Sequence, residues 1–231
     1  YGAAVIEQFE KLDIFTSVRT RALIQSRDKL RSLQMLSKAG LDLPKSFIVY
    51  KTEQLEPMLD QLPEGPVIIK LLEGTHGAGV VIAESRRSAI SMIEAFTKLG
   101  KQVLVQEFIE ESDGTDIRAI VVGGKVIAAM KRKAAKGEFR SNLHRGATSE
   151  PYALNEKEAH IVITAAKTMG LEVAGIDLLP SNRGKLIMEV NASPGLEGIE
   201  TTTQINVGWH IMDFVVKRAQ KIAHYKKVKM K

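Results

Sequence analysis

The chain has 231 residues, of which 44% are hydrophobic and 26% charged, a composition typical of globular proteins. It contains no cysteine, so disulfides, thiolate metal sites and thiol nucleophiles are excluded. No apolar run approaches the roughly 18 residues of a membrane span, and no signal peptide is recognisable, so we expect a cytoplasmic protein without a membrane partner.

The net charge of +6 is unevenly distributed along the sequence. Residues 125–145 carry seven basic side chains against Glu138 alone, and residues 217–231 carry seven more with no acid. The rest of the chain is acidic overall. Local positive segments in an otherwise acidic chain indicate that the protein binds anionic ligands, rather than binding nucleic acid non-specifically. We interpret the C-terminal segment as a solvated helix end.

The first 72 residues predict three helices and two strands. Helices are expected at residues 3–12, from the start signal Ser26-Arg27-Asp28 to Gly40, and at 53–61, with strands at 47–50 and 66–72. Lys29 lies in the first turn of the second helix, where a positive charge is unfavourable unless an anion is near. Lys70 is the one charge inside its apolar strand, so it either extends to solvent or meets an anion.

A glycine-rich segment follows that strand. Gly74, Gly77 and Gly79 lie between two strand patterns, and the backbone N–H groups of such a hairpin can close over phosphates. The Gly-Lys-Ser/Thr ending of a Walker loop is absent, and no helix follows. An ordinary glycine-rich hairpin is the alternative interpretation.

The remaining elements mix strands and helices. We expect strands at 103–109, 116–122 and 126–132, and helices from the Ser85 cap to about Leu99, from the Asn155 capping box to Gly170, and at 205–222. Asp116 and Arg118 share one strand face. Residues 139–146 form a basic loop. The pattern predicts an α+β or mixed α/β fold.

The most informative stretch is a hairpin of two strands, 173–179 and 184–191, joined by a turn at residues 181–184. Leu186, Met188 and Val190 are expected on the apolar face of the second strand. Their pairing brings Asp177 level with Glu189, and Asn191 lies two residues further along on the same face. Two carboxylates and an amide oxygen, without His or Cys, suit Mg²⁺, which keeps waters and shares its shell with phosphates. Ordinary polar alternation of a half-exposed hairpin is the alternative. The turn at Pro194-Gly195 argues against it, because it fixes Asn191.

Four separated pieces occur in the order seen in ATP-grasp ligases. They are Lys70 before the glycine-rich hairpin, Gln106-Glu-Phe-Ile, Asp177, and Met188-Glu-Val-Asn-Ala-Ser-Pro-Gly. Within that superfamily, two segments most resemble the RimK family of α-L-glutamate ligases: Arg140-Ser-Asn-Leu-His-Arg-Gly and Val190-Asn-Ala-Ser-Pro-Gly-Leu-Glu-Gly-Ile-Glu. The resemblance covers nearly the whole chain from about Ser26.

The resemblance implies an ATP-grasp fold, in which two α+β subdomains clasp ATP between their sheets. We expect residues 1–25 to be the remnant of an N-terminal domain that is otherwise missing from this chain. The small subdomain with its glycine-rich lid would occupy residues 26–105. The C-terminal subdomain, with the Mg²⁺ site, would occupy residues 106–231.

The resemblance also implies roles for particular residues. The nucleotide would be bound by Lys29 and Lys70 at the phosphates, the 74–79 lid, Glu107 and Phe108 at the adenine, Asp116 near the ribose, and Arg140, Ser141 and Asn142. Two Mg²⁺ ions, with Mn²⁺ as an alternative, would be held by Asp177, Glu189 and Asn191. From strand face and local charge we add Arg118, Arg132 and Arg145 as candidate catalytic residues that hold acidic substrate groups.

The implied reaction is ATP-dependent carboxylate–amine ligation through an acyl phosphate. The family adds L-glutamate to the C-terminus of a small-subunit ribosomal protein. The expected partners are therefore ATP, L-glutamate and an acidic peptide or ribosomal protein C-terminus, without direct nucleic-acid contact; a homo-oligomer is left open.

Two alternatives remain open. A sibling ligase could glutamylate a cofactor or an amino-group carrier protein of lysine biosynthesis. From a different class, the chain could be a non-catalytic nucleotide- or RNA-binding module. Aromatic residues make up only 5% of the chain, so recognition by base stacking is poorly supported.

Overall fold

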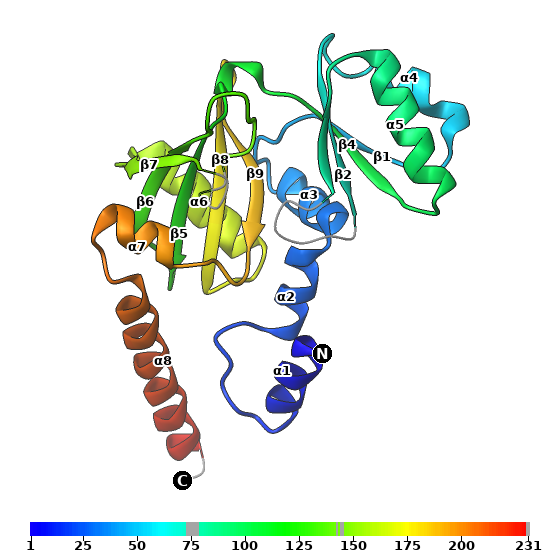
Figure 1. Ribbon diagram of the computed structural model, residues 1–231. Coiled ribbons are helices and arrows are strands. Elements are labelled where there is room, and N and C mark those ends of the chain that lie inside the picture. Colours follow the sequence, from blue (N-terminus) through cyan, green and yellow to red (C-terminus); the bar gives the residue numbers. More distant parts are fainter. Residues whose placement is uncertain (73–78, 142, 144–145, 230–231) are drawn as a thin grey trace.

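Two antiparallel sheets lie side by side in the fold, each with its own helices (Figure 1). The computed structural model describes residues 1–72, 79–141, 143 and 146–229, with side chains up to residue 222. Both sheets are purely antiparallel, and helices pack against them. The α+β prediction is therefore confirmed.

The smaller sheet has four strands in the order β1-β4-β2-β3. Its strands and helices are β1 Ser46–Val49, the 3₁₀ helix η1 Thr52–Gln54, α4 Leu55–Leu59, β2 Val67–Leu71, β3 Val80–Ala83, α5 Arg86–Lys98 and β4 Val103–Glu107. Apolar strand residues such as Ile69 and Val105 form one core with Leu55 and Ile93 of the two helices. The expected Ser85 cap is confirmed, since its hydroxyl accepts a hydrogen bond from the Ser88 N–H at 3.2 Å.

The larger sheet has five strands in the order β7-β6-β5-β8-β9. After the 3₁₀ helix η2 Glu110–Ser112 come β5 Thr115–Val122, β6 Lys125–Lys133, β7 Thr148–Pro151, β8 Val173–Ser181 and β9 Gly184–Asn191. Gly123 and Gly124 join β5 to β6 with φ of +57° and +78°, the left-handed values that a two-residue hairpin turn requires. The sequence did not predict β7, whose polar residues are mostly exposed.

One irregularity changes the expected faces of β9. The register shifts between Asp177 and Leu178, where β8 passes from pairing with Glu189 to pairing with Ile187. Met188 is the extra residue of this bulge. Ile187 and Val190 therefore point into the same core, and the expected alternation of Leu186, Met188 and Val190 was wrong. The pairing of Asp177 with Glu189, which the sequence predicted, is confirmed.

Three helices, two from the N-terminal region and one from the middle of the sequence, pack on one face of the larger sheet. One face carries α6 Glu156–Thr168, and α2 Thr20–Arg27 and α3 Lys29–Lys38 contribute Ala22 and Leu36 to the same core. The Asn155–Glu158 capping box of α6 is confirmed. The start signal Ser26-Arg27-Asp28 is confirmed at Asp28, which caps α3 by accepting from the Arg31 N–H at 3.0 Å and leaves Lys29 in the first turn. The sequence did not predict the separate helix α2 at residues 20–27.

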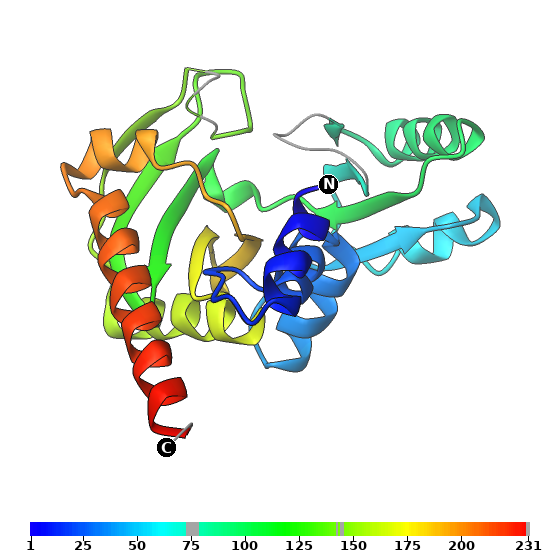
Figure 2. The same ribbon diagram turned by 90° about the horizontal axis from the view of Figure 1, so that it is seen from below.

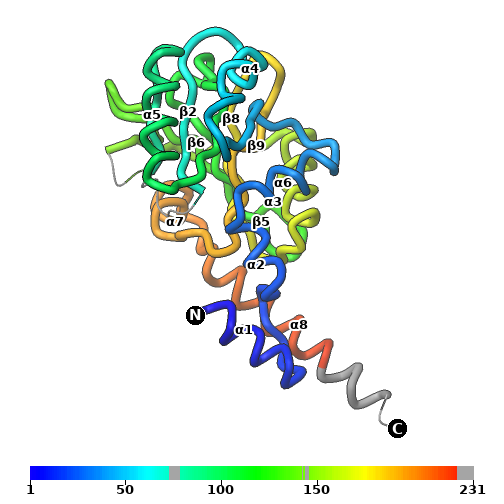
Figure 3. Tube along the Cα trace, turned by 90° about the vertical axis from the view of Figure 1, so that its right-hand side faces the viewer, coloured from blue at the N-terminus to red at the C-terminus, as the bar shows by residue number. Residues whose placement is uncertain are grey.

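The other side of the larger sheet meets α7 Glu197–Thr203 and the start of α8 Val207–Lys229. The sequence did not predict α7, and α8 continues beyond the expected residue 222. Both α8 and α1 Gly2–Lys11 extend away from the sheets (Figures 1 and 3). Figure 2, seen from below, shows α8 running past the larger sheet. Within the described part of the chain, every helix is too short or too polar to cross a membrane.

Candidate active site

A row of charged side chains crosses one face of the larger sheet. Strand pairing sets Asp116 of β5 opposite Arg132 of β6, and Arg118 of β5 opposite Asp177 of β8. Asp177 in turn lies opposite Glu189 of β9. Acids and bases therefore face one another across β6, β5 and β8, and a further acid, Glu189, follows on β9.

Two forked ion pairs hold this row together. Arg118 donates from Nε to Oδ1 of Asp177 at 2.7 Å and from Nη2 to Oδ2 at 2.6 Å. Arg132 makes the same pair of bonds with Asp116, both at 2.6 Å. Arg132 Nη2 also lies 3.3 Å from Oδ1 of Asp177, so it links the two acids. Paired bonds of this kind fix the geometry of both partners.

The electrostatic environment shifts the pKa values of the three acids in different directions. Burial raises the pKa of Asp177, but the charges of Arg118 and Arg132 outweigh burial and hold its pKa below the usual value. Burial raises the pKa of Asp116 despite its bonds with Arg132. Partial loss of water around its carboxylate, together with the neighbouring Asp177 charge, raises the pKa of Glu189, although the residue as a whole stays exposed. Asp177 is thus the best-stabilised anion, and Glu189 is the exposed one.

Asn191 completes the expected oxygen ligands. It pairs with Gly175 of β8, and Pro194 folds back over that glycine. A Cβ atom on Gly175 would lie 2.8 Å from the Pro194 Cβ, so only glycine allows this approach. The buried Nδ2 atom of Asn191 has no hydrogen-bond partner among the described residues. The oxygen and nitrogen of a side-chain amide are assigned from their contacts, so the unpaired end of Asn191 can equally be its oxygen. A buried polar atom without a partner is suited to bind a ligand.

Asp177, Glu189 and Asn191 do not form an all-protein metal cage. In the part of the chain that the structure describes, no three His, Asp or Glu side chains are grouped so that they could hold a metal ion by themselves. Two carboxylates and one amide do fit Mg²⁺, which keeps waters and takes further oxygens from phosphates.

The smaller sheet presents a lysine to this row. Lys70 Nζ donates to Oε1 of Gln106 at 2.7 Å, and burial lowers the pKa of Lys70 to about 8, opposed by the charge of Glu189 and assisted by Lys29. Lys29 Nζ donates to the carbonyl oxygen of Leu72 at 3.3 Å. The structure therefore brings both predicted lysines together, within electrostatic reach of Glu189.

Glu107 and Phe108 lie where the chain leaves the smaller sheet. Glu107 is buried, and its Oε1 accepts from the Lys45 N–H at 2.7 Å and from the guanidinium of Arg183. Phe108 is half-buried. The Glu107 carboxylate thus joins the two sheets, because Arg183 belongs to the turn between β8 and β9.

The basic segment has a different environment from the one we expected. Arg132 is only 3% exposed and is bound to Asp116, so it cannot present its guanidinium to a substrate, which contradicts the predicted contact. Asp116 is buried too and also accepts from the Ser141 hydroxyl at 2.5 Å, so its carboxylate is not free for a ribose. Arg140 forms a forked pair with Glu138. Gly74, Gly77, Asn142 and Arg145 lie outside the described residues, whereas Gly79 is described at φ +79°.

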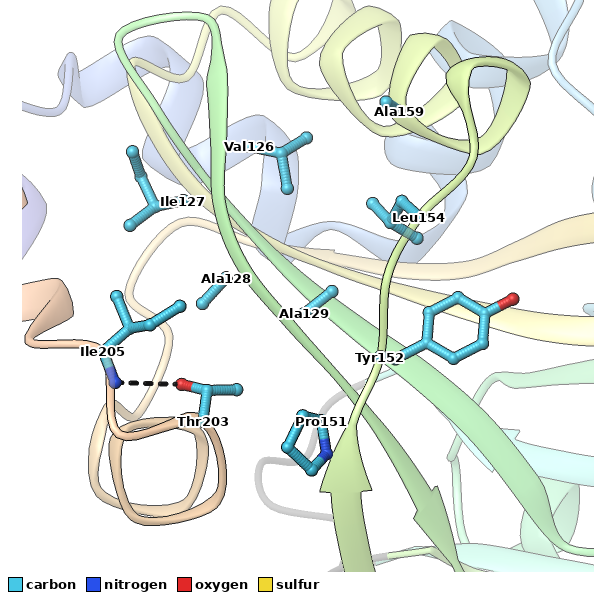
Figure 4. Close-up of a pocket in the computed structure, with 10 residues that line it drawn as sticks. All are labelled: Val126, Ile127, Ala128, Ala129, Pro151, Tyr152, Leu154, Ala159, Thr203 and Ile205. Carbon is cyan, nitrogen blue, oxygen red and sulfur yellow. Dashed lines mark hydrogen bonds between the residues drawn. The ribbon is translucent and has the colours of Figure 1, made fainter.

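An apolar cavity of about 280 Å³ lies away from the charged row. Its walls come from β6, the segment before α6 and the link between α7 and α8, including Ile127, Tyr152 and Ile205 (Figure 4). It contains none of the predicted site residues. We therefore place the candidate site at the charged row.

Three contacts of the site were not predicted. They are the Lys70–Gln106 bond, the Glu107–Arg183 pair and the close approach of Pro194 to Gly175. Only the last had a signal in the sequence, since a glycine inside an apolar strand marks a close backbone approach.

Comparison with solved structures identifies the fold. The ATP-grasp ligase PsnB, in complex with a phosphomimetic precursor variant, Mg and ADP, is 22% identical with a TM-score of 0.75; the match covers 94% of this chain and 66% of PsnB. The D-alanine–D-alanine ligase of Bacillus anthracis is 20% identical with a TM-score of 0.74, covering 96% of this chain and 77% of that one. The fold is that of ATP-grasp ligases.

Comparison of sequences narrows this class. A family model described as RimK-like ATP-grasp domain matches residues 26–215. A probable alpha-L-glutamate ligase of Aliivibrio salmonicida (strain LFI1238) is 52% identical over 219 residues, which is 95% of this chain and 73% of the relative. One from Syntrophotalea carbinolica (strain DSM 2380 / NBRC 103641 / GraBd1) is 51% identical over 220 residues, with the same coverage. The chain belongs to the RimK-like ATP-grasp family. It is an ATP-dependent ligase that joins a carboxylate to an amine.

Proposed function

We propose that this ligase adds L-glutamate through its amino group to the carboxylate of an acidic acceptor. The proposal rests on the curated relatives, which are named probable alpha-L-glutamate ligases and match 95% of the chain at about 50% identity. The charged row and the two lysines opposite it supply the groups that such a reaction needs.

The chemistry follows from the weakness of a carboxylate as an acyl donor. An acceptor carboxylate oxygen attacks the γ-phosphorus of ATP, ADP leaves, and an acyl phosphate forms. The glutamate nitrogen then attacks the acyl carbon, the C–O bond to phosphate breaks, and the nitrogen loses a proton. Phosphoryl transfer of this kind depends on alignment and charge neutralisation rather than on a protein nucleophile.

Residues of both sheets would share these tasks. Lys70 and Lys29 would bind the phosphates from the smaller sheet. Asp177, Glu189 and Asn191 would hold one or two Mg²⁺ ions, or Mn²⁺ in their place. The bound metal would neutralise phosphate charge. Arg118 would offer its guanidinium to a carboxylate or phosphoryl group.

The identity of the acceptor molecule is a further part of the proposal. The family resemblance favours the C-terminus of a small-subunit ribosomal protein, with a cofactor or an amino-group carrier protein as the competing acceptors. The relatives are named as ligases, which argues against the alternative of a non-catalytic nucleotide- or RNA-binding module that binds without turnover.

The test measures ADP release with Mg²⁺, a candidate acceptor peptide and each of the twenty amino acids, followed by mass spectrometry of the products. We expect release that depends on both Mg²⁺ and glutamate, and a product heavier by glutamate residues. Turnover with another amino acid would contradict the glutamate proposal. Salt-sensitive RNA binding without any turnover would favour the binding module.

A further inference from the structure

Two arginines hold Asp177, and they hold it differently. Arg118 directs both of its bonds to Asp177, at 2.7 and 2.6 Å. Arg132 directs its two short bonds to Asp116 and reaches Asp177 only with a third contact, at 3.3 Å. Among the described residues, Arg118 therefore binds one carboxylate, whereas Arg132 joins two.

These contacts leave little room on the Asp177 carboxylate. A carboxylate has about four lone-pair directions. Oδ1 accepts from both arginines and Oδ2 accepts from Arg118, so three of these directions are used. A divalent cation that takes both oxygens of Asp177 has to replace the bonds to Arg118.

Burial decides which arginine can move. The side chain of Arg118 is 20% exposed to solvent, whereas that of Arg132 is 4% exposed. Displacing Arg132 would leave Asp116 and Asp177 as two buried acids without the cation that they share, which is strongly unfavourable. Displacing Arg118 leaves Asp177 its contact with Arg132, and the cation supplies the missing charge.

We propose that Arg118 is an exchangeable counterion that a divalent cation displaces from Asp177, and that Arg132 is a fixed positioning residue that keeps hold of Asp116 and Asp177. This inference rests on the metal site proposed above. Once displaced, the planar fork of Arg118 is free to bind a carboxylate or phosphoryl oxygen of the substrates. Metal binding thereby prepares the site for the acidic groups that react there.

Charge-conserving substitutions separate this exchange from long-range electrostatics. Lysine keeps the charge of arginine but lacks the fork that spans both oxygens. Arg118→Lys weakens the competitor for Asp177, so metal binding should tighten. Arg132→Lys loosens the support of Asp177, so metal binding should weaken. Long-range electrostatics alone predicts no change in either variant, because the charge is the same.

The first experiment measures Mn²⁺ affinity from the free Mn²⁺ signal in electron paramagnetic resonance, with the full chain and the non-hydrolysable ATP analogue AMPPNP. We expect the Kd to fall about tenfold in Arg118→Lys and to rise about tenfold in Arg132→Lys. The matched control is Arg218→Lys, which should leave the Kd unchanged. Arg218 lies on α8 and pairs with Glu172 at 3.3 Å.

The second experiment observes the exchange directly. The Nε–H groups of Arg118 and Arg132 are followed in ¹⁵N–¹H spectra with AMPPNP, before and after saturation with Mg²⁺, with assignments from the two lysine variants. The Arg118 signal should move as its bond to Asp177 breaks, and the Arg132 signal should persist. An unchanged Arg118 signal at saturation would overturn the proposal.

Failure of the metal site is distinguishable from failure of the exchange. If the parent chain binds no Mn²⁺ with AMPPNP, or if Glu189→Gln binds it as well as the parent, the metal site itself is wrong and the exchange falls with it. If Glu189→Gln abolishes binding but the two lysine variants shift the Kd in the same direction or not at all, only the exchange is wrong.

Discussion

Lys70 of β2 donates a 2.7 Å hydrogen bond to Oε1 of Gln106 on the neighbouring strand β4. This bond orients a half-buried ammonium within electrostatic reach of Glu189 on the other sheet. We therefore propose that this charge binds the triphosphate of ATP between the two sheets.

Replacing that charge should reduce nucleotide affinity. Lys70→Met keeps the aliphatic stem and removes one charge-assisted contact, which contributes about 1.5–3 kcal/mol, so the Kd for ATP should rise roughly ten- to hundredfold. The stability at pH 7 should change little, because the loss of the Gln106 bond is offset by the removal of a buried charge. Titration with a fluorescent nucleotide, with Lys38→Met of an exposed lysine as the control, measures this. An unchanged Kd would remove Lys70 from the proposed nucleotide site.

The lowered pKa of Lys70 makes nucleotide binding depend on pH. With a pKa of about 8, against 10.5 for an ordinary lysine, the ammonium loses its proton as the pH rises through about 8. ATP affinity should therefore fall between pH 7 and pH 9, and binding near pH 8.5 should take up a proton. Calorimetry in buffers of different ionisation enthalpy measures that uptake. Lys70→Arg should remove both effects, because arginine stays charged in this range.

The same pKa shift fixes the sign of a stability effect. Between pH 8 and 10.5 the unfolded chain holds a proton on Lys70 that the folded chain lacks, so this residue makes unfolding less favourable as the pH rises through that window. Urea unfolding of the parent chain and Lys70→Met at pH 7.5 and 9.5 isolates the contribution. The parent should gain stability relative to the variant at the higher pH, and a relative loss would contradict the lowered pKa.

Glu189 is the predicted metal ligand that the structure leaves exposed. Glu189→Gln keeps the shape and removes the charge, so Mg²⁺-dependent ATP turnover should be lost, while the free energy of unfolding should stay within about 0.5 kcal/mol. Glu197→Gln, at an exposed acid in the first turn of α7, is the control. Near-normal turnover in a folded Glu189→Gln variant would remove the metal site from the mechanism.

The position of Asn191 should depend on the absence of a side chain at Gly175, its partner on β8. Gly175→Ala would place a Cβ atom 2.8 Å from the Pro194 Cβ, an overpacking that costs about 1–3 kcal/mol and displaces the segment after Asn191. Mn²⁺ affinity should fall together with stability. Gly195→Ala lies in the same segment with nothing within 4 Å of the added atom, so it should change neither quantity. Equal behaviour of the two variants would contradict this role of Pro194.

Local patterns predicted the central hairpin well. The turn at residues 181–184 was enough to set Asp177 opposite Glu189, and the capping box at Asn155 was equally readable. These signals involve residues that are close in sequence, where turn and capping chemistry determines geometry.

The exact register of neighbouring strands was not readable in the same way. Arg132 belongs to a segment rich in positive charge, which led us to expect a substrate contact. The β5–β6 register instead sets Arg132 opposite Asp116, and the pair is buried. The bulge at Met188 likewise changes which side chains share a face, and nothing in the local pattern announces it. Short elements such as β7 and α7 are stabilised by packing rather than by their own sequence.

The turn between β8 and β9 is tied to the segment that links the two sheets. The guanidinium of Arg183 binds Glu107, which is buried at the end of β4, and the Asn182 N–H donates to Oε1 of Glu111 at 3.0 Å. Arg183→Met should leave Glu107 with its bond from the Lys45 N–H but without a cationic partner. A buried acid that loses such a partner costs about 1–3 kcal/mol, which urea unfolding would detect.

Loss of this tie should affect nucleotide binding as well as stability, because a nucleotide bound between the sheets needs them in a fixed relation. We expect the Kd for ATP to rise several-fold in Arg183→Met and to be partly restored in Arg183→Lys, which keeps the charge but not the fork. Asn182→Ala is the matched control in the same turn, since the bond to Glu111 comes from its backbone and survives the substitution. If Arg183→Met lowers stability but leaves the Kd unchanged, the pair with Glu107 supports the fold without positioning the two sheets for the nucleotide.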